Sequence, residues 1–217
     1  MKSLWNMPRV RLFLAVQGLL YLWFLSWDLL DTGDTRWIKY GAIVLCFLFA
    51  LDQAARGGDR LTAAALAFTL GADAFLLVLD RYYPLGIGLF CGAHLLYRGR
   101  IGREIGGLRR PFVVLPVVCG LLVGIAGCGA DMAMAVVYVL LLVGNVVLGW
   151  SRLRGRSGRL LCAGLTLLLC CDVCVGLHNL SGPLPGAISA FADFGMWLFY
   201  LPSQVCVALS AAPERSE

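Results

Sequence analysis

Residues 131–150 read DMAMAVVYVLLLVGNVVLGW, a run of twenty residues in which the only charge is at the first position. Such a run predicts a membrane-crossing helix, because about 20 apolar residues span the hydrocarbon core of a bilayer. Seven comparable runs flank it, at residues 12–30, 37–54, 61–79, 84–98, 111–127, 159–179 and 187–210. We therefore expect an all-α polytopic bundle of eight transmembrane helices that forms one integral membrane domain over residues 1–217.

The composition of the chain excludes an ordinary water-soluble domain. Of its 217 residues 60% are hydrophobic and 14% are charged, whereas about 25% are charged in soluble domains. The mean hydropathy is +0.82. The net charge of +5 does not predict nucleic-acid binding, because membrane proteins place basic residues in their cytoplasmic loops.

The distribution of basic residues predicts the orientation of the bundle. With an even number of spans, fifteen of the 18 Lys and Arg residues fall on the side of the N-terminus, which predicts that both termini are cytoplasmic. Arg36, Lys39 and Arg81 are on the other side. We expect the membrane to be a bacterial inner membrane. The Arg clusters at residues 98–110 and 152–159 either only set the orientation of the helices in the membrane or also bind anionic lipid phosphates.

An internal duplication is a further hypothesis. The third and fourth runs share three features with the seventh and eighth: an Asp in the first helix of the pair, Pro and Gly near the turn, and an LxY or LFY near the end of the second helix. This pattern predicts two four-helix halves in parallel orientation, and binding sites are common at such repeat interfaces.

Ionisable residues inside the spans are the candidates for function, because a charge at the centre of a membrane helix costs at least about 2.5 kcal/mol. Asp73 and Asp172 each lie thirteen residues after a basic residue at the cytoplasmic side, which places both about 20 Å from that side. Asp193 falls at a similar depth, His94 falls near the middle, and Lys39 enters from the outer face. These groups meet if their helices are neighbours.

Two buried carboxyl groups fit general acid and base chemistry. Desolvation favours the neutral form of one carboxyl while a second one stays ionised, supported by Lys39 or His94, so that one acts as acid and the other as base. The same parts also serve proton relays in transporters. A third alternative is that the aspartates only bond neighbouring helices. The residues expected to support the site or bind substrate are Lys39, His94, Tyr97, Asp193, Tyr200 and Gln204. For Tyr97, Tyr200 and Gln204, packing and bonds between helices are the alternative.

A metal or cofactor is not expected. Cys171 and Cys174 form a CxxC pattern, but no second pair accompanies it. The chain has two histidines, too few for a zinc site with three His ligands. Eight of the nine cysteines lie in apolar runs, where cysteine acts as a small hydrophobic residue, so a disulfide framework is not expected either.

Several motifs together resemble the YhhN family, whose characterised members are lysoplasmalogenases. They are Lys39 at the start of the second run, GADAFLLV around Asp73, GAHLLY with His94 and Tyr97, CDVCVGL around Asp172, and FYLPSQ with Tyr200 and Gln204. The resemblance extends from about Lys39 to Ser210. The chain departs from the family at Ala72 and Cys171, where the family often has Gly and Ser.

The resemblance implies a membrane hydrolase that needs no cofactor and cleaves the vinyl ether bond of lysoplasmalogens to a fatty aldehyde and glycerophospho-ethanolamine or -choline. Its paired aspartates match Asp73 and Asp172. The expected partners are a lysophospholipid substrate and membrane lipids, with no nucleic acid, while the oligomeric state stays open. A small proton-coupled transporter or lipid-binding membrane protein that uses the same aspartates is the alternative.

Overall fold

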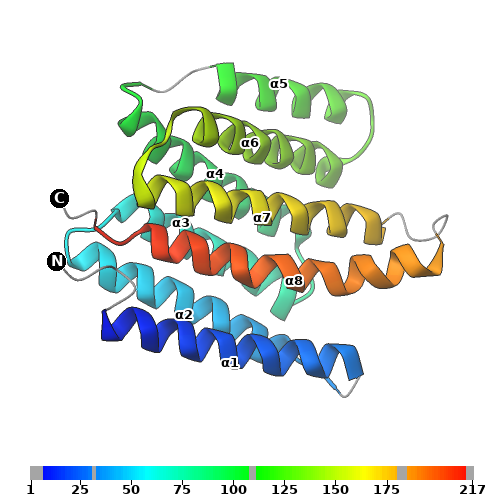
Figure 1. The fold of residues 1–217 in the computed structure, drawn as a ribbon. Helices are drawn as coiled ribbons and strands as arrows, with labels where there is room; N and C mark the ends of the chain where they lie inside the picture. The colour runs from blue at the N-terminus through cyan, green and yellow to red at the C-terminus, as the bar shows by residue number, and fades with distance from the viewer. Residues whose placement is uncertain (1–6, 31–32, 108–110, 180–184, 214–217) are drawn as a thin grey trace.

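The computed structural model of the protein describes residues 7–30, 33–107, 111–179 and 185–213, and these residues are all-helical, as predicted. Figure 1 shows the helices lying side by side and running back and forth along one axis. In chain order they are α1 (Pro8–Leu30), α2 (Arg36–Ala55), α3 (Arg60–Asp73), the π-helical segment η2 (Ala74–Val78), α4 (Tyr83–Glu104), α5 (Pro111–Ile125), α6 (Ala130–Arg152), α7 (Gly155–Asn179) and α8 (Gly186–Ser210).

Five of these elements are long and apolar enough to cross a membrane: α1, α2, α3 with η2, α6 and α7. The helix α5 is apolar but has 15 residues. The helices α4 and α8 are long enough, at 22 and 25 residues, but they are not among the five. Many large apolar side chains are exposed, and Ile125 reaches 83%. Exposed apolar surface of this extent is typical of a protein that contacts lipid.

The fourth run was predicted too short. It was expected to end at residue 98, whereas α4 continues to Glu104. Arg98 and Arg100, which we assigned to a cytoplasmic loop, are 1% and 2% exposed and lie inside the bundle. The prediction failed because it assumed that an arginine at the end of an apolar run faces water.

The arrangement of the helices brings distant parts of the chain together. The helix α8 packs against α7 and also against α1, α2 and α3, while α6 packs against α4, α5 and α7. The helix α5 lies at one edge of the bundle, on α6 (Figure 1). The approach of α7 and α8 is close: a Cβ atom at Gly164 would lie 2.9 Å from the carbonyl oxygen of Ser203. Small residues allow such contacts between membrane helices.

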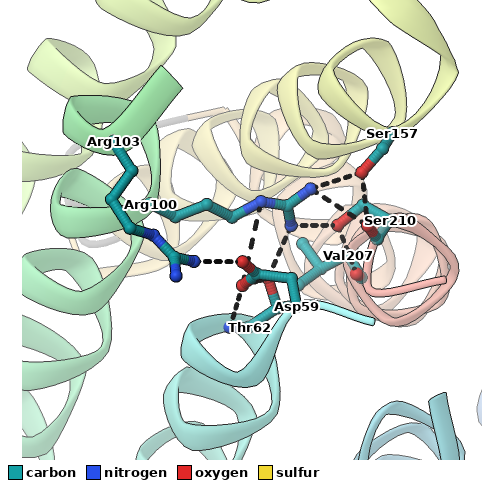
Figure 2. Close-up of polar contacts among 7 residues, drawn as sticks. All are labelled: Asp59, Thr62, Arg100, Arg103, Ser157, Val207 and Ser210. Carbon is teal, nitrogen blue, oxygen red and sulfur yellow. Dashed lines mark hydrogen bonds and ion pairs between the residues drawn. The ribbon is translucent and has the colours of Figure 1, made fainter. Parts of the chain in front are cut away.

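A buried arginine joins four helices at the end of the bundle where α8 finishes (Figure 2). The guanidinium of Arg100 on α4 donates to the hydroxyl of Thr62 at 2.5 Å, to the hydroxyl of Ser157 at 2.5 Å, and to the hydroxyl and carbonyl oxygens of Ser210 at 2.8 and 3.0 Å. Asp59, which caps α3, pairs with Arg100 at 3.9 Å and with Arg103. This network fixes α3, α4, α7 and α8 relative to one another.

Candidate active site

Asp73 lies where α3 changes from α-helical to π-helical geometry. The π-turn is closed by a hydrogen bond from the Leu79 amide to the Ala74 carbonyl at 2.9 Å. Such π-bulges often occur at functional sites. The Asp73 side chain is buried, and the hydroxyl of Tyr200 on α8 lies 2.8 and 2.7 Å from its two carboxylate oxygens. A tyrosine from another helix therefore holds this carboxyl group in place.

Asp172 forms a second pair of the same kind. It lies on α7, is half-buried, and its Oδ2 accepts a hydrogen bond of 2.7 Å from the hydroxyl of Tyr138 on α6. Within the described residues, Tyr138 is the hydrogen-bond donor to this carboxyl group. The departure from the family pattern at Cys171 left the partner of Asp172 open, and Tyr138 fills that role. Sequence reasoning missed Tyr138, although a hydroxyl-bearing residue within an otherwise apolar span was the available signal.

The two Asp–Tyr pairs lie on helices that pack together. The helix α8, which carries Tyr200, packs against α3 and α7, and α7 packs against α6. Cys171, which precedes Asp172 on α7, is buried. We refer to Asp73, Tyr200, Asp172 and Tyr138 together as the aspartate cluster.

His94 lies beside this cluster and contacts it through an aromatic ring. Its imidazole is fully buried, and its centroid is 5.1 Å from the ring of Tyr138 and 5.7 Å from the ring of Tyr97. The side-chain amide of Asn145 donates to the His94 carbonyl at 2.9 Å and lies 3.2 Å from Nδ1. Asn145 on α6 thus bonds the neighbouring helix α4. The ring of His94 packs against Tyr138, the residue that donates to Asp172.

Lys39 reaches the cluster only indirectly. We expected it to support one of the aspartates, but its Nζ pairs with Asp28 of α1 at 2.7 Å. The reason is that Asp28 lies at the same end of the neighbouring helix, where a second bond from Thr35 at 2.6 Å also holds it. The Lys39 ammonium also lies 4.8 Å from the ring of Trp197, which makes an edge contact of 5.3 Å with Tyr200.

Asp193 is not part of the cluster, contrary to the expected convergence. Its Oδ1 lies within hydrogen-bond distance of Nδ1 of His178, and the side chains of Asp193 and His178 are 54% and 49% exposed. Asp193 lies only seven residues after the start of α8 at Gly186, so it pairs at the end of the α7–α8 hairpin instead of deeper in the bundle. Gln204 is buried on α8, and its amide nitrogen lies 3.2 Å from the hydroxyl of Ser203.

The comparison with protein families identifies the chain. The model of the YhhN family matches residues 35–211. The chain belongs to the YhhN family. Comparison with curated proteins and with solved structures gave no match. The matched range of this YhhN protein contains both aspartates, both tyrosines and His94.

The site of this YhhN protein is suited to proton transfer. Each carboxyl group has a tyrosine hydroxyl as neighbour, and a group held in this way is positioned for general acid or base chemistry. Asp73 is enclosed and both of its oxygens contact Tyr200, whereas Asp172 is more exposed and bonds through one oxygen. In the described part of the chain, no group of three or more His, Cys, Asp or Glu side chains is placed to hold a metal ion.

Proposed function

We propose that this protein is a membrane hydrolase that cleaves the vinyl ether bond of lysoplasmalogen. The observation that carries the proposal is the pair of carboxyl groups inside the bundle, Asp73 and Asp172, each of which accepts a hydrogen bond from a tyrosine on another helix. Membership of the YhhN family is consistent with this activity. Two carboxyl groups in one buried site supply the acid and the base that vinyl ether hydrolysis needs.

We assign the acid to Asp172 and electrostatic stabilisation to Asp73. Asp172 is the more exposed of the two, and among the described residues its carboxyl group bonds to Tyr138 through Oδ2. Asp73 is enclosed and its two oxygens are held by Tyr200. A fixed carboxylate in a site of low dielectric constant stabilises a nearby positive charge without reorganising.

In the proposed reaction, Asp172 transfers its proton to the vinyl carbon that is not bonded to oxygen. The double-bond electrons form the new C–H bond, and the ether oxygen shares its electrons to give an oxocarbenium ion next to Asp73. Water adds to the cationic carbon and returns a proton to Asp172, which leaves a hemiacetal. Collapse of the hemiacetal breaks the bond to the glycerol oxygen and releases the fatty aldehyde and the glycerophospho-alcohol.

A groove beside the site is suited to the hydrocarbon chain of the substrate. It has a volume of about 200 Å³ and lies between α1 and α8. Leu14, Gly18 and Val205 belong to its largely apolar wall, as does Leu201, which follows Tyr200 in the chain.

We also propose that all eight helices cross the membrane and that both ends of the chain face the cytoplasm. Helices of 22 and 25 residues are about 33 and 37 Å long, enough for a hydrocarbon core of about 30 Å. The mean hydropathy of α4 and α8 is lowered by residues inside the bundle, such as His94, Arg98 and Gln204. The start of α1 and the end of α8 lie at the same end of the bundle (Figure 1), the end with most of the basic residues.

The test is release of fatty aldehyde by the purified protein in detergent. Lysoplasmalogen should yield aldehyde, while the matched 1-acyl lysophospholipid, which has no vinyl ether, should not. Asp73→Asn and Asp172→Asn should each abolish the release. Asp193→Asn is the matched control, because this exposed carboxyl pairs with His178 outside the cluster, and its activity should stay within about twofold, as for most surface changes.

Thermal unfolding in detergent distinguishes a loss of catalysis from a loss of stability in the Asn variants. Asn variants that keep the parent unfolding temperature but lose activity support the proposal. Asn variants that release aldehyde at the parent rate contradict it. If the protein releases no aldehyde and instead drives pH-dependent uptake into vesicles, the aspartates serve a transporter.

A further inference from the structure

Arg98 is a buried cation that lacks an acidic partner in the described part of the chain. Its side chain is on α4 and is 1% exposed, and Nη2 lies 3.5 Å from the carbonyl oxygen of Leu141. Nε and Nη1 are buried and have no hydrogen-bond partner among the described residues. Arg100, which is equally buried, has four hydrogen bonds and an ion pair. The donors of Arg98 are therefore available to an anion.

The guanidinium lies directly behind the wall of a groove. Its central carbon is 5.2 Å from the centroid of the Phe112 ring, in the first turn of α5. A Cβ atom at Gly144 of α6 would lie 2.7 Å from Nη2 and 3.3 Å from the Phe112 ring. Phe112 and Gly144 thus separate the charge of Arg98 from the space between α5 and α6.

That space is an apolar groove at the edge of the bundle. It has a volume of about 260 Å³ and is lined by Phe112 and Gly144 together with Leu115, Leu140, Val143 and Val147. Its residues on α5 belong to the first two turns of the helix, at the end of the bundle that we propose to be cytoplasmic. Volume and lining suit one alkyl chain of a lipid.

We propose that Arg98 and the first turn of α5 bind the phosphodiester of a membrane phospholipid, one chain of which lies in the α5–α6 groove. A lipid supplies both features that the site requires: an anion for a desolvated guanidinium and a chain for an apolar groove. Guanidinium groups bind phosphate through parallel hydrogen bonds, and the amide groups at a helix N-terminus add favourable dipoles. The Phe112 ring moves aside to let the phosphate reach Arg98.

This lipid site is separate from the aspartate cluster and does not depend on hydrolysis. Free phosphate shares the anion but not the chain, so it should bind far more weakly than the lipid. A lipid without phosphate shares the chain but not the anion. Binding of free phosphate therefore tests the anion site alone, and binding of a lipid without phosphate tests the apolar groove alone.

The test is lipid binding to the full-length protein in a non-ionic detergent, measured by native mass spectrometry. The probes are phosphatidylglycerol, the diacylglycerol with the same chains, and inorganic phosphate. Phosphatidylglycerol should bind at least about tenfold more tightly than diacylglycerol, because charge-assisted hydrogen bonds of this kind are each worth a factor of ten or more.

Arg98→Met should reduce the affinity for phosphatidylglycerol to that for diacylglycerol. Arg152→Met is the matched control: it removes the same charge from an exposed position at the end of α6, and the affinity should change by less than about twofold, as expected for a screened surface charge. Val147→Phe fills the groove at a residue that is 54% exposed, and it should weaken the binding of both lipids.

Three results would overturn the proposal. They are equal affinity of the parent protein for the two lipids, unchanged binding of phosphatidylglycerol by Arg98→Met, and unchanged binding of both lipids by Val147→Phe. Should Arg98→Met fail to fold, the proposal is still tested by the comparison of the two lipids on the parent protein and by the Val147→Phe variant.

Discussion

The hydroxyl group of Tyr138 offers the sharpest test of the candidate active site. Tyr138→Phe removes one oxygen atom, which donates to Asp172 at 2.7 Å. The ring itself contacts His94 at 5.1 Å and Phe90 at 5.6 Å, and both contacts remain in the variant. The substitution therefore changes the hydrogen bond to the proposed acid and leaves the packing of α4 against α6 in place.

The expected loss follows from the strength of that bond. Asp172 becomes a carboxylate as it gives up its proton, and a hydrogen bond to a charged group contributes about 1.5–3 kcal/mol. About 1.36 kcal/mol corresponds to a tenfold change in rate. If the bond positions Asp172 in the transition state, kcat/KM for aldehyde release should fall by about 10- to 150-fold. The unfolding temperature should fall only slightly, because no cavity larger than the lost oxygen is created.

The assay is continuous aldehyde release in detergent, coupled to oxidation of NADH by an alcohol dehydrogenase. Tyr40→Phe is the matched control. Its hydroxyl faces α3 and lies 3.5 Å from the carbonyl oxygen of Leu70, so this longer contact is worth little. We expect kcat/KM of Tyr40→Phe to stay within about threefold of the parent value, a change that corresponds to less than about 1 kcal/mol.

A double-mutant cycle decides whether Tyr138 acts through Asp172. The small loss of unfolding temperature in Tyr138→Phe should disappear when Asp172 is already Ala, which cannot accept the hydrogen bond, because the two residues share one interaction. The reasoning is refuted if Tyr138→Phe keeps kcat/KM within twofold of the parent. It is also refuted if the two substitutions lower the unfolding temperature independently.

Three further predictions concern the bundle and its chemistry. Arg100→Met should lower the free energy of unfolding by about 3–5 kcal/mol, because it leaves buried groups without their partner. The side chain of Arg103 is 58% exposed, so Arg103→Met should lower the free energy of unfolding by only about 0.2–1 kcal/mol. Equal unfolding temperatures of the two variants would contradict the role of the Figure 2 network. Gly164→Ala should destabilise the protein by about 1–3 kcal/mol, because the added Cβ atom meets the α8 backbone. Gly176→Ala on the same helix should be neutral or slightly stabilising, because the added Cβ atom meets open space. Thermal unfolding of the two variants measures the difference. The rate of aldehyde release should show a bell-shaped dependence on pH, because one carboxyl must be protonated and the other ionised; a flat profile would exclude two titrating groups.

The helices of this protein could be predicted from sequence because each one contains a long apolar run that ends at polar residues. The predicted boundaries agree with the structure within four residues except at the end of α4. That helix carries Arg98 and Arg100 into the bundle interior, where Arg100 finds the hydroxyl groups of three other helices. A single sequence shows the charge of such residues but not the partners that hold them inside.

The sequence analysis named the two acidic groups of the candidate site and Tyr200, the hydrogen-bond donor to Asp73, but it missed Tyr138, the donor to Asp172. Asp73 and Asp172 stand out because they are charged residues in apolar runs. Tyr138 does not stand out, because a tyrosine in a membrane helix is usually a packing residue, and its role depends on how α6 meets α7. For the same reason Lys39 and Asp193 were assigned by depth, while their actual partners are Asp28 and His178, which lie on neighbouring helices at the same end.

The contacts of the two aspartates also bear on the hypothesis of internal duplication. Tyr138 on α6 precedes Asp172 by 34 residues and bonds it. Tyr40 on α2 precedes Asp73 by 33 residues. Each Asp thus has a tyrosine at a similar distance upstream, on the helix before its own, which is the pattern that two related four-helix halves would produce. The two aspartates differ in their donors: Asp172 bonds the upstream tyrosine, whereas Asp73 bonds Tyr200 on α8. If the chain consists of two such halves, the contact between Asp73 and Tyr200 joins one half to the other.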